Sequence, residues 1–247
     1  MIDVLFLILG ACVGSFLNVC IYRIPQKMSV VFGPSHCPHC SKPIKIQDLV
    51  PLLSFFLLKG KCRYCETKVS WRYPLVELLT AVLFYAAYQR WGLSWQTPAM
   101  CAFFSALVVA ALVDFDTYLI PDGVLGIALI LGIPTLWLAA RELFFNGLVG
   151  FLSAGLLMLA IALATRGGMG GGDVKLSAVM GFFLGWPEIL IGLFIAFTSG
   201  ALVGLILMLL KKKKRKNLLP FGPYLALGGV IGAFYGEQLL NWYLSLF

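Results

Sequence analysis

The feature that most constrains this chain is a series of long apolar runs separated by short polar stretches. Hydrophobic residues make up 60% of the chain and charged residues only 12%, whereas soluble domains are about half apolar. Because so few charged residues cannot cover the surface of a soluble domain of this length, the pattern predicts a membrane protein. Each crossing needs roughly 20 apolar residues. The runs predict about eight transmembrane helices, at 3–22, 73–90, 97–113, 123–140, 143–165, 175–186, 188–210 and 222–246.

The predicted fold class is therefore all-α: a polytopic membrane protein with a small zinc-binding-type cytoplasmic loop. We expect a first transmembrane helix at 1–22, a cysteine-containing cytoplasmic loop at 23–72 and a transmembrane core at 73–247. The sixth run is short for a span, and Gly185-Trp186-Pro187 after it predicts either a tight turn or a kink. The first run lacks a preceding basic region and a following small-residue cleavage site, so we interpret it as a retained span.

Positive charge is distributed unevenly between the predicted loops. Seventeen of the 19 Lys and Arg residues lie in 23–72, at Arg166 and Lys175, and in the run 211–216. The positive-inside rule places these on the cytoplasmic side, so we expect both termini outside. Topology and contact with anionic lipid account for the net charge of +8, and we expect no nucleic-acid partner.

Four of the seven cysteines form two C-x-x-C pairs in the predicted cytoplasmic loop. Such paired knuckles are typical of a Zn²⁺ ion bound by four thiolates, and the alternative of disulfides is disfavoured in a reducing cytosol. Four protein ligands leave no position for water, so the predicted zinc is structural. His36 and His39, the only histidines, lie beside the first pair and are alternative ligands. The predicted ligands are Cys37, Cys40, Cys62 and Cys65.

Acidic residues gather at the ends of the predicted spans, where charge is costly. Asp114, Asp116 and Asp122 surround the junction of the third and fourth spans, and Asp173 follows a glycine-rich turn. The predicted orientation puts both groups on the cytoplasmic side, so Asp114 and Asp173 can meet. Each has a structural alternative: Asp122 and Asp173 as helix caps, and Asp116 as a solvated turn residue. Glu77, inside the second span, is expected to pair with a polar group of another helix.

A pair of aspartates in partly apolar surroundings indicates acid–base chemistry. Two carboxyl groups a few ångströms apart cannot easily both ionise, so they share a proton. One then activates a water molecule while the other protonates the carbonyl oxygen or the leaving amine. The glycines before Asp173 leave its surface open to an extended substrate. The alternatives are a proton- or metal-coupled transporter that uses membrane-edge aspartates and a zinc-organised scaffold without chemistry.

Four motifs, in order along the chain, resemble those of the prepilin peptidase (type IV leader peptidase) family. More distantly, the chain resembles the wider class of G-x-G-D intramembrane aspartic proteases. The motifs are G-S-F-L-N-V-C-I-Y-R-I-P at 14–25, the double C-x-x-C, D-x-D-x-x-x-x-P-D at 114–122 and M-G-x-G-D-x-K-L at 169–176.

The resemblance implies an aspartic endopeptidase of the bacterial inner membrane. Its implied substrates are prepilins and pseudopilins, whose basic leader is removed at the cytoplasmic face. It also implies N-methylation of the new N-terminus with S-adenosylmethionine as cofactor, for which the sequence shows no separate binding signature. The implied catalytic residues are Asp114 and Asp173, with Asp116, Gly170, Gly172 and Lys175 as supporting residues of the active site.

Overall fold

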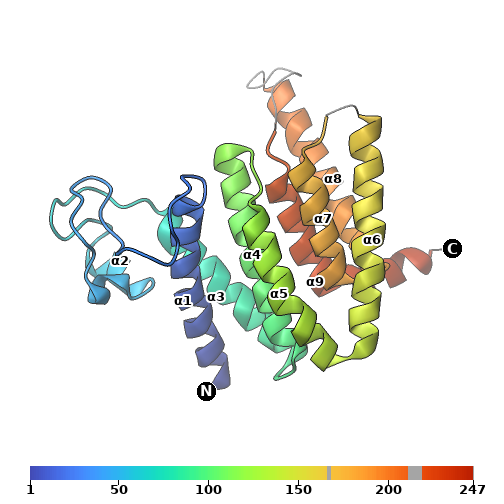
Figure 1. The fold of residues 1–247 in the computed structure, drawn as a ribbon, viewed down its shortest axis with the longest axis horizontal. Helices are drawn as coiled ribbons and strands as arrows, with labels where there is room; N and C mark the ends of the chain where they lie inside the picture. Colours follow the sequence, from blue (N-terminus) through green and yellow to red (C-terminus); the bar gives the residue numbers. More distant parts are fainter. Residues whose placement is uncertain (166–167, 211–218, 247) are drawn as a thin grey trace. The chain divides into compact units, whose positions relative to one another are not determined.

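A computed structural model describes residues 1–165, 168–210 and 219–246 of the chain (Figure 1). This part contains helices and no β-strand, which confirms the predicted all-α fold class. Eight of the helices coincide with the eight predicted apolar runs, and two short ones lie in the loop after the first. They are α1 (Ile2–Arg23), η1 (Ile46–Leu49), α2 (Leu53–Leu57), α3 (Arg72–Trp91), α4 (Gln96–Thr117), α5 (Asp122–Ala139), α6 (Arg141–Ala164), α7 (Gly171–Leu184), α8 (Glu188–Leu209) and α9 (Gly222–Leu244).

Five of these helices, α1, α4, α5, α6 and α8, are long and apolar enough to cross a membrane. The other three long helices fall outside this group, and α7, with 14 residues, is shorter than the roughly 20 that a crossing needs. Five helices thus have the length and hydropathy of membrane spans, while crossing by α3, α7 and α9 stays a prediction. Arg166 and the basic run 211–216, on which the predicted orientation partly depends, lie outside the described residues.

The chain forms two compact units, Met1–Leu93 and Ser94–Phe247. In the first unit α1 packs along α3. A Cβ atom added to Gly10 would lie 2.7 Å from Cα of Ala81, and one added to Gly14 would lie 2.7 Å from Cα of Glu77. The G-x-x-x-G spacing of α1 therefore lets the two helix backbones approach closely, as small residues do between membrane helices.

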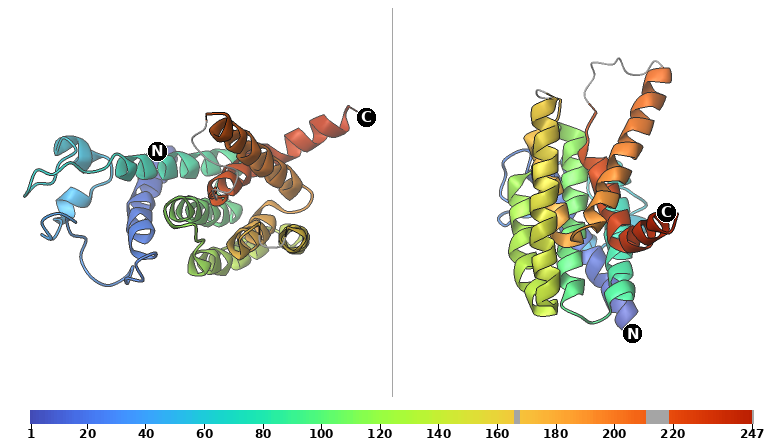
Figure 2. Two further views of the ribbon diagram at one scale, coloured as in Figure 1. Left: turned by 90° about the horizontal axis from the view of Figure 1, so that it is seen from above. Right: turned by 90° about the vertical axis from the view of Figure 1, so that its right-hand side faces the viewer.

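The second unit is built around α4. In the most hydrophobic 18-residue segment of α4, 67% is buried, whereas the corresponding share is 22% in each of α5, α6 and α8. Helix α4 packs on α5 and α9, while α6 runs beside α7 and α8 beside α9 (Figures 1 and 2). The Phe103 ring of α4 stacks on the Phe183 ring of α7 with centroids 4.8 Å apart. Asp114, in the last turn of α4, is buried in this helix bundle.

Close glycine contacts fix α7 against α6. A Cβ atom on Gly150 would overlap the backbone of Gly181, and one on Gly181 would overlap that of Gly150. Helix α7 ends at Leu184 and α8 begins at Glu188, so the three residues between them form a turn. Of the two alternatives for this segment, the tight turn is confirmed. Helix α7 is thus packed closely against α6 and ends in a turn before α8.

Candidate active site and tetracysteine loop

Asp114 lies in the last turn of α4 and is only 5% exposed. Its Oδ2 atom accepts a hydrogen bond of 2.7 Å from the backbone N–H of Gly222, the first residue of α9. The first N–H groups of a helix have no partner within the helix, and the helix N-terminus favours a negative charge beside it. The start of α9 therefore holds the Asp114 carboxylate in place.

Asp173 lies in the first turn of α7, half-buried. Its Oδ2 atom accepts a hydrogen bond of 3.2 Å from the backbone N–H of Gly170, so it caps its own helix. The charge of Asp114 acts on Asp173 directly. The two carboxyl groups therefore lie within electrostatic range of each other at one end of the second unit, although 59 positions separate them in the sequence.

The other acidic residues of the cluster lie differently. Asp116 is exposed in the last turn of α4. The interpretation of Asp122 as an N-cap is wrong, because α5 begins at Asp122 and its side chain makes no capping hydrogen bond. Lys175 Nζ instead donates to both Asp122 oxygens, at 2.9 and 2.7 Å. This exposed ion pair joins the start of α5 to the start of α7.

The glycines before Asp173 differ in their surroundings. A Cβ atom on Gly171 would meet nothing within 4 Å, whereas one on Gly172 would lie 3.0 Å from Cβ of Ile120, in the connection between α4 and α5. A Cβ atom on Gly170 would lie 3.3 Å from the capping Oδ2 of Asp173. The expected open surface is therefore found at Gly171, while Gly172 serves the packing of the α4–α5 connection against α7.

Sequence reasoning did not single out Gly222. The signal that was available is Pro223, because proline is favoured in the first turn of a helix. That signal locates the start of α9 and does not identify the carboxylate that faces it. A Cβ atom on Gly222 would lie 2.9 Å from both Cβ and Oδ2 of Asp114, so only glycine fits this contact.

The four loop cysteines form one cluster in the first unit. Their sulfur atoms all lie within 4.8 Å of one another. Cys37 Sγ and Cys65 Sγ are 3.8 Å apart, too far for the roughly 2.05 Å bond of a disulfide. A tetrahedron with Zn–S bonds of about 2.3 Å has edges of about 3.8 Å. The cluster therefore fits a structural zinc ion.

The two C-x-x-C knuckles repeat one backbone pattern. The N–H of Cys37 donates to the carbonyl of Lys42, and that of Cys62 donates to the carbonyl of Thr67. In each knuckle the residue after the second cysteine, Ser41 or Glu66, has a left-handed φ near 55°. Each knuckle thus turns both of its sulfurs toward one side.

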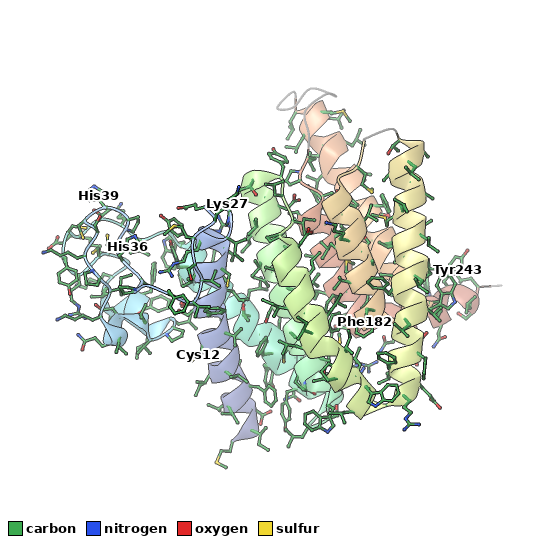
Figure 3. The ribbon with its side chains drawn as sticks, in the orientation of Figure 1. Cys12, Lys27, His36, His39, Phe182 and Tyr243 are labelled. Carbon is green, nitrogen blue, oxygen red and sulfur yellow. The ribbon has the colours of Figure 1, made fainter. Side chains whose placement is uncertain are left out.

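One thiol of the cluster, that of Cys65, is suited to binding as a thiolate. Hydrogen bonding to Thr67 lowers the pKa of the Cys65 thiol to about 6, so this ligand ionises readily at neutral pH. His36 and His39 lie on the same loop (Figure 3), but neither belongs to the sulfur cluster found among the described residues. The ligand set that the structure supports is the four cysteines.

Comparison with known proteins covers most of the chain. Residues 8–91 match the family model described as the bacterial peptidase A24 N-terminal domain, and residues 101–205 match that of the type IV leader peptidase family. The two matches fall within the first and second compact units. No solved structure matches the chain significantly.

Several full-length relatives carry one name, prepilin leader peptidase/N-methyltransferase. The relative from Bacillus subtilis (strain 168) is 35% identical over 246 residues, which cover 100% of this chain and 99% of the relative. The relative from Aeromonas hydrophila is 37% identical, and the match covers 95% of this chain and 91% of the relative. The one from Pseudomonas aeruginosa is 33% identical, covering 97% and 92%. The similarity thus extends over both units.

Proposed function

Because this chain belongs to the type IV leader peptidase family, we propose that it removes the basic leader from prepilin and pseudopilin precursors. We assign the catalysis to Asp114 and Asp173. The observation that supports this assignment is the electrostatic proximity of two carboxyl groups, one from the end of α4 and one from the start of α7. Paired carboxyl groups are the means by which aspartic proteases hydrolyse a peptide bond without a covalent intermediate.

In the proposed mechanism the two aspartates share one proton. The ionised carboxylate takes a proton from a water molecule, which attacks the scissile carbonyl carbon, while the protonated partner donates to the leaving amine. The Gly222 N–H fixes the orientation of Asp114, and the Gly170 N–H fixes that of Asp173. The open side of Gly171 gives an extended substrate backbone access beside Asp173.

The relatives' names support an N-methyltransferase activity as well. In the proposed reaction the α-amine exposed by cleavage is the methyl acceptor, and S-adenosylmethionine supplies the methyl group when bound. The proposed location is the bacterial inner membrane, with the aspartates at the cytoplasmic face and both termini outside. The distribution of Lys and Arg supports this orientation. The zinc ion proposed for the tetracysteine loop would stabilise the fold of that loop and take no part in the chemistry.

Cleavage of a prepilin with a basic leader by the purified protein in detergent tests the peptidase proposal. The variants are Asp114→Asn and Asp173→Asn, with Glu142→Gln as the control because Glu142 is an exposed acid in the first turn of α6. We expect the first two to lose cleavage and the control to retain it, with melting temperature and zinc content unchanged in all three. Normal cutting by Asp114→Asn or Asp173→Asn would overturn the assignment. If the wild type cuts no such substrate and liposomes containing it take up protons or metal ions, the transporter alternative replaces the proposal.

A further inference from the structure

The loop between α1 and α3 contains an apolar segment, residues 46–58, that the proposed chemistry does not use. Asp48 is its only charged residue, and η1 and α2 lie within it. An apolar stretch of this length is too short to cross a bilayer, and it is typical of a buried helix or of a re-entrant or interfacial membrane segment. The exposure of its side chains distinguishes these alternatives.

The outward face of α2 is apolar and exposed. Leu53, Phe56 and Leu57 have the spacing i, i+3, i+4 of one helix face, and they are 56%, 62% and 72% exposed. Ser54 and Phe55, on the other side of α2, line the space between the loop, α1 and α3. Helix α2 therefore packs on its own unit by one face and presents large apolar side chains on the other, so it is not a buried helix.

Hydrogen bonds of Glu77 give the depth of this segment along α1 and α3. The backbone N–H of Leu52 donates to Oε2 of Glu77 at 2.7 Å, and the Ser15 hydroxyl of α1 bonds to the same carboxyl group. From Ser15 to Arg23, the last residue of α1, a helix rises about 12 Å, and from Arg72, the first residue of α3, to Glu77 about 8 Å. The start of α2 therefore lies beside the two helices and not beyond their ends, and Figure 1 shows α2 level with the middle of α1.

The backbone of the segment is suited to an apolar environment, where polar groups need partners within the protein. The N–H groups of Ser54, Phe56 and Leu58 donate to carbonyl oxygens of the same segment. Leu52 has a φ of 61°, which is rare for a bulky side chain, and its N–H meets the Glu77 carboxylate instead of a carbonyl. Glu77 thus supplies the partner that the turn into α2 lacks.

The charges of the segment are paired or lie at its two ends. Asp48, whose side chain is 6% exposed, accepts a hydrogen bond of 2.8 Å from Nε of Arg63 in an ion pair. Lys45 and Lys59 flank the segment and are exposed, and lysines at such positions extend their ammonium groups to lipid headgroups. Trp71, directly before α3, packs its ring against an aromatic ring of α2 at 4.8 Å, and tryptophan is enriched at membrane interfaces. The pattern therefore fits the boundary between headgroups and acyl chains.

We propose that residues 46–58 form a re-entrant segment that enters the lipid leaflet beside α1 and α3. The outward face of α2 lies against acyl chains, Lys45 and Lys59 lie at anionic headgroups, and Glu77 positions the segment through Leu52. The loop is then divided between an embedded segment and cysteine knuckles in water. A soluble partner protein does not reach a face at this depth, which favours lipid as the occupant. The inference depends on α1 crossing the membrane and is independent of the peptidase and methyltransferase proposals.

Photocrosslinking of the full-length, zinc-loaded protein tests this segment in nanodiscs of phosphatidylethanolamine and phosphatidylglycerol. The photoreactive amino acid p-benzoylphenylalanine replaces Phe56 of α2, Phe194 or His39 in turn, and mass spectrometry identifies lipid adducts. Phe194 is an exposed residue of α8, a helix with the length and hydropathy of a membrane span. His39 is an exposed residue of the first cysteine knuckle, on the side of the loop away from α2 (Figure 3). We expect acyl-chain adducts at Phe56 and Phe194 and none at His39.

The proposal is overturned if Phe194 gives lipid adducts and Phe56 gives none, because the segment then lies in water or against protein. It is also overturned if Phe56 and His39 give equal adducts, because the whole loop then lies on the membrane surface without an embedded part. Neither result depends on prepilin cleavage.

Hydrogen exchange of the same nanodiscs tests the positioning role of Glu77. Glu77→Leu removes the acceptor for the Leu52 N–H and should speed exchange in peptides covering 50–58 about tenfold or more, whereas Glu77→Gln keeps an acceptor oxygen and should change it less than about threefold. Equal exchange in the wild type and Glu77→Leu would show that Glu77 does not hold the segment. The crosslinking result at Phe56 stands on the wild-type background, so the proposal stays testable if Glu77→Leu does not fold.

Discussion

The backbone N–H of Gly222 donates a hydrogen bond of 2.7 Å to Oδ2 of Asp114 across 108 positions of the sequence. This contact joins the start of α9 to the end of α4 and leaves no room for a side chain at residue 222. The Asp114 carboxylate is consequently oriented by a third helix, in addition to the two that carry the aspartates. A change at a residue without a side chain is therefore expected to affect the proposed chemistry.

Gly222→Ala is predicted to lower prepilin cleavage strongly. The new Cβ would lie 2.9 Å from Cβ and Oδ2 of Asp114, so either the aspartate or the start of α9 must move. A shift of about 1 Å in a catalytic group can cost roughly 100-fold in rate. The measurement is the rate of leader removal under single-turnover conditions. Gly126→Ala in α5 is the control, because its Cβ would meet nothing within 4 Å. Equal rates for the two variants would contradict the prediction.

Gly171 and Gly172, the two glycines directly before Asp173, are predicted to differ in their tolerance of substitution by alanine. Gly172→Ala places a Cβ 3.0 Å from that of Ile120, so the α4–α5 connection must shift slightly, at a cost of about 1–3 kcal/mol in stability. Gly171→Ala meets no neighbour and lies in the first turn of α7, where alanine favours the helix. Thermal unfolding in detergent should show a lower melting temperature for the first variant only. The reverse order would show that Gly172 does not pack on Ile120.

Much of the fold follows from local sequence pattern. The eight apolar runs predicted the eight long helices because a hydrophobic segment of that length in a membrane satisfies its backbone only as a helix. The two C-x-x-C spacings predicted the sulfur cluster because each knuckle is a local turn that presents both of its thiols together. The turn at 185–187 was readable for a similar reason, since glycine and proline end helices through their own backbone geometry.

The contacts that order the site could not be predicted in the same way. The partner of Asp114 is a backbone group, and every non-proline residue of the chain carries such a group. Asp122 was interpreted as a cap because it follows Pro121, but the side chain of Lys175 on another helix competes for its carboxylate. Both contacts depend on which helices pack against each other, and an apolar run predicts a helix without predicting its packing partner.

The ion pair between Asp122 and Lys175 is predicted to contribute modestly. Both side chains are largely exposed, with fractions of 68% and 59%, and exposed pairs contribute about 0.2–1 kcal/mol. Asp122→Asn and Lys175→Met should each lower the cleavage rate less than about fivefold. The double variant should cleave at least as fast as the slower of the two single variants, because the two side chains act through one ion pair. Cleavage rates of the four proteins at low and high salt measure this coupling. Loss of cleavage in Lys175→Met comparable with that of Asp173→Asn would indicate that Lys175 contacts the substrate.

Zinc removal is predicted to unfold the loop of the first unit. Cys37 is the buried member of the sulfur cluster, and a structural zinc site needs four protein ligands, so the loss of one thiolate leaves the site incomplete. Cys37→Ser should therefore lose bound zinc, measured by atomic emission on the purified protein, and become sensitive to protease within 24–71.

The matched control for this prediction is Cys12→Ser, because Cys12 is an exposed thiol on α1 outside the cluster (Figure 3). It should keep its zinc and its resistance to protease. Prolonged treatment of the wild type with a chelator should reproduce the protease sensitivity of Cys37→Ser, since metal binding and folding of such a loop are coupled. If the wild type contains no zinc, or if Cys37→Ser retains it, the four cysteines do not hold a metal and the loop must be stabilised by its backbone turns alone.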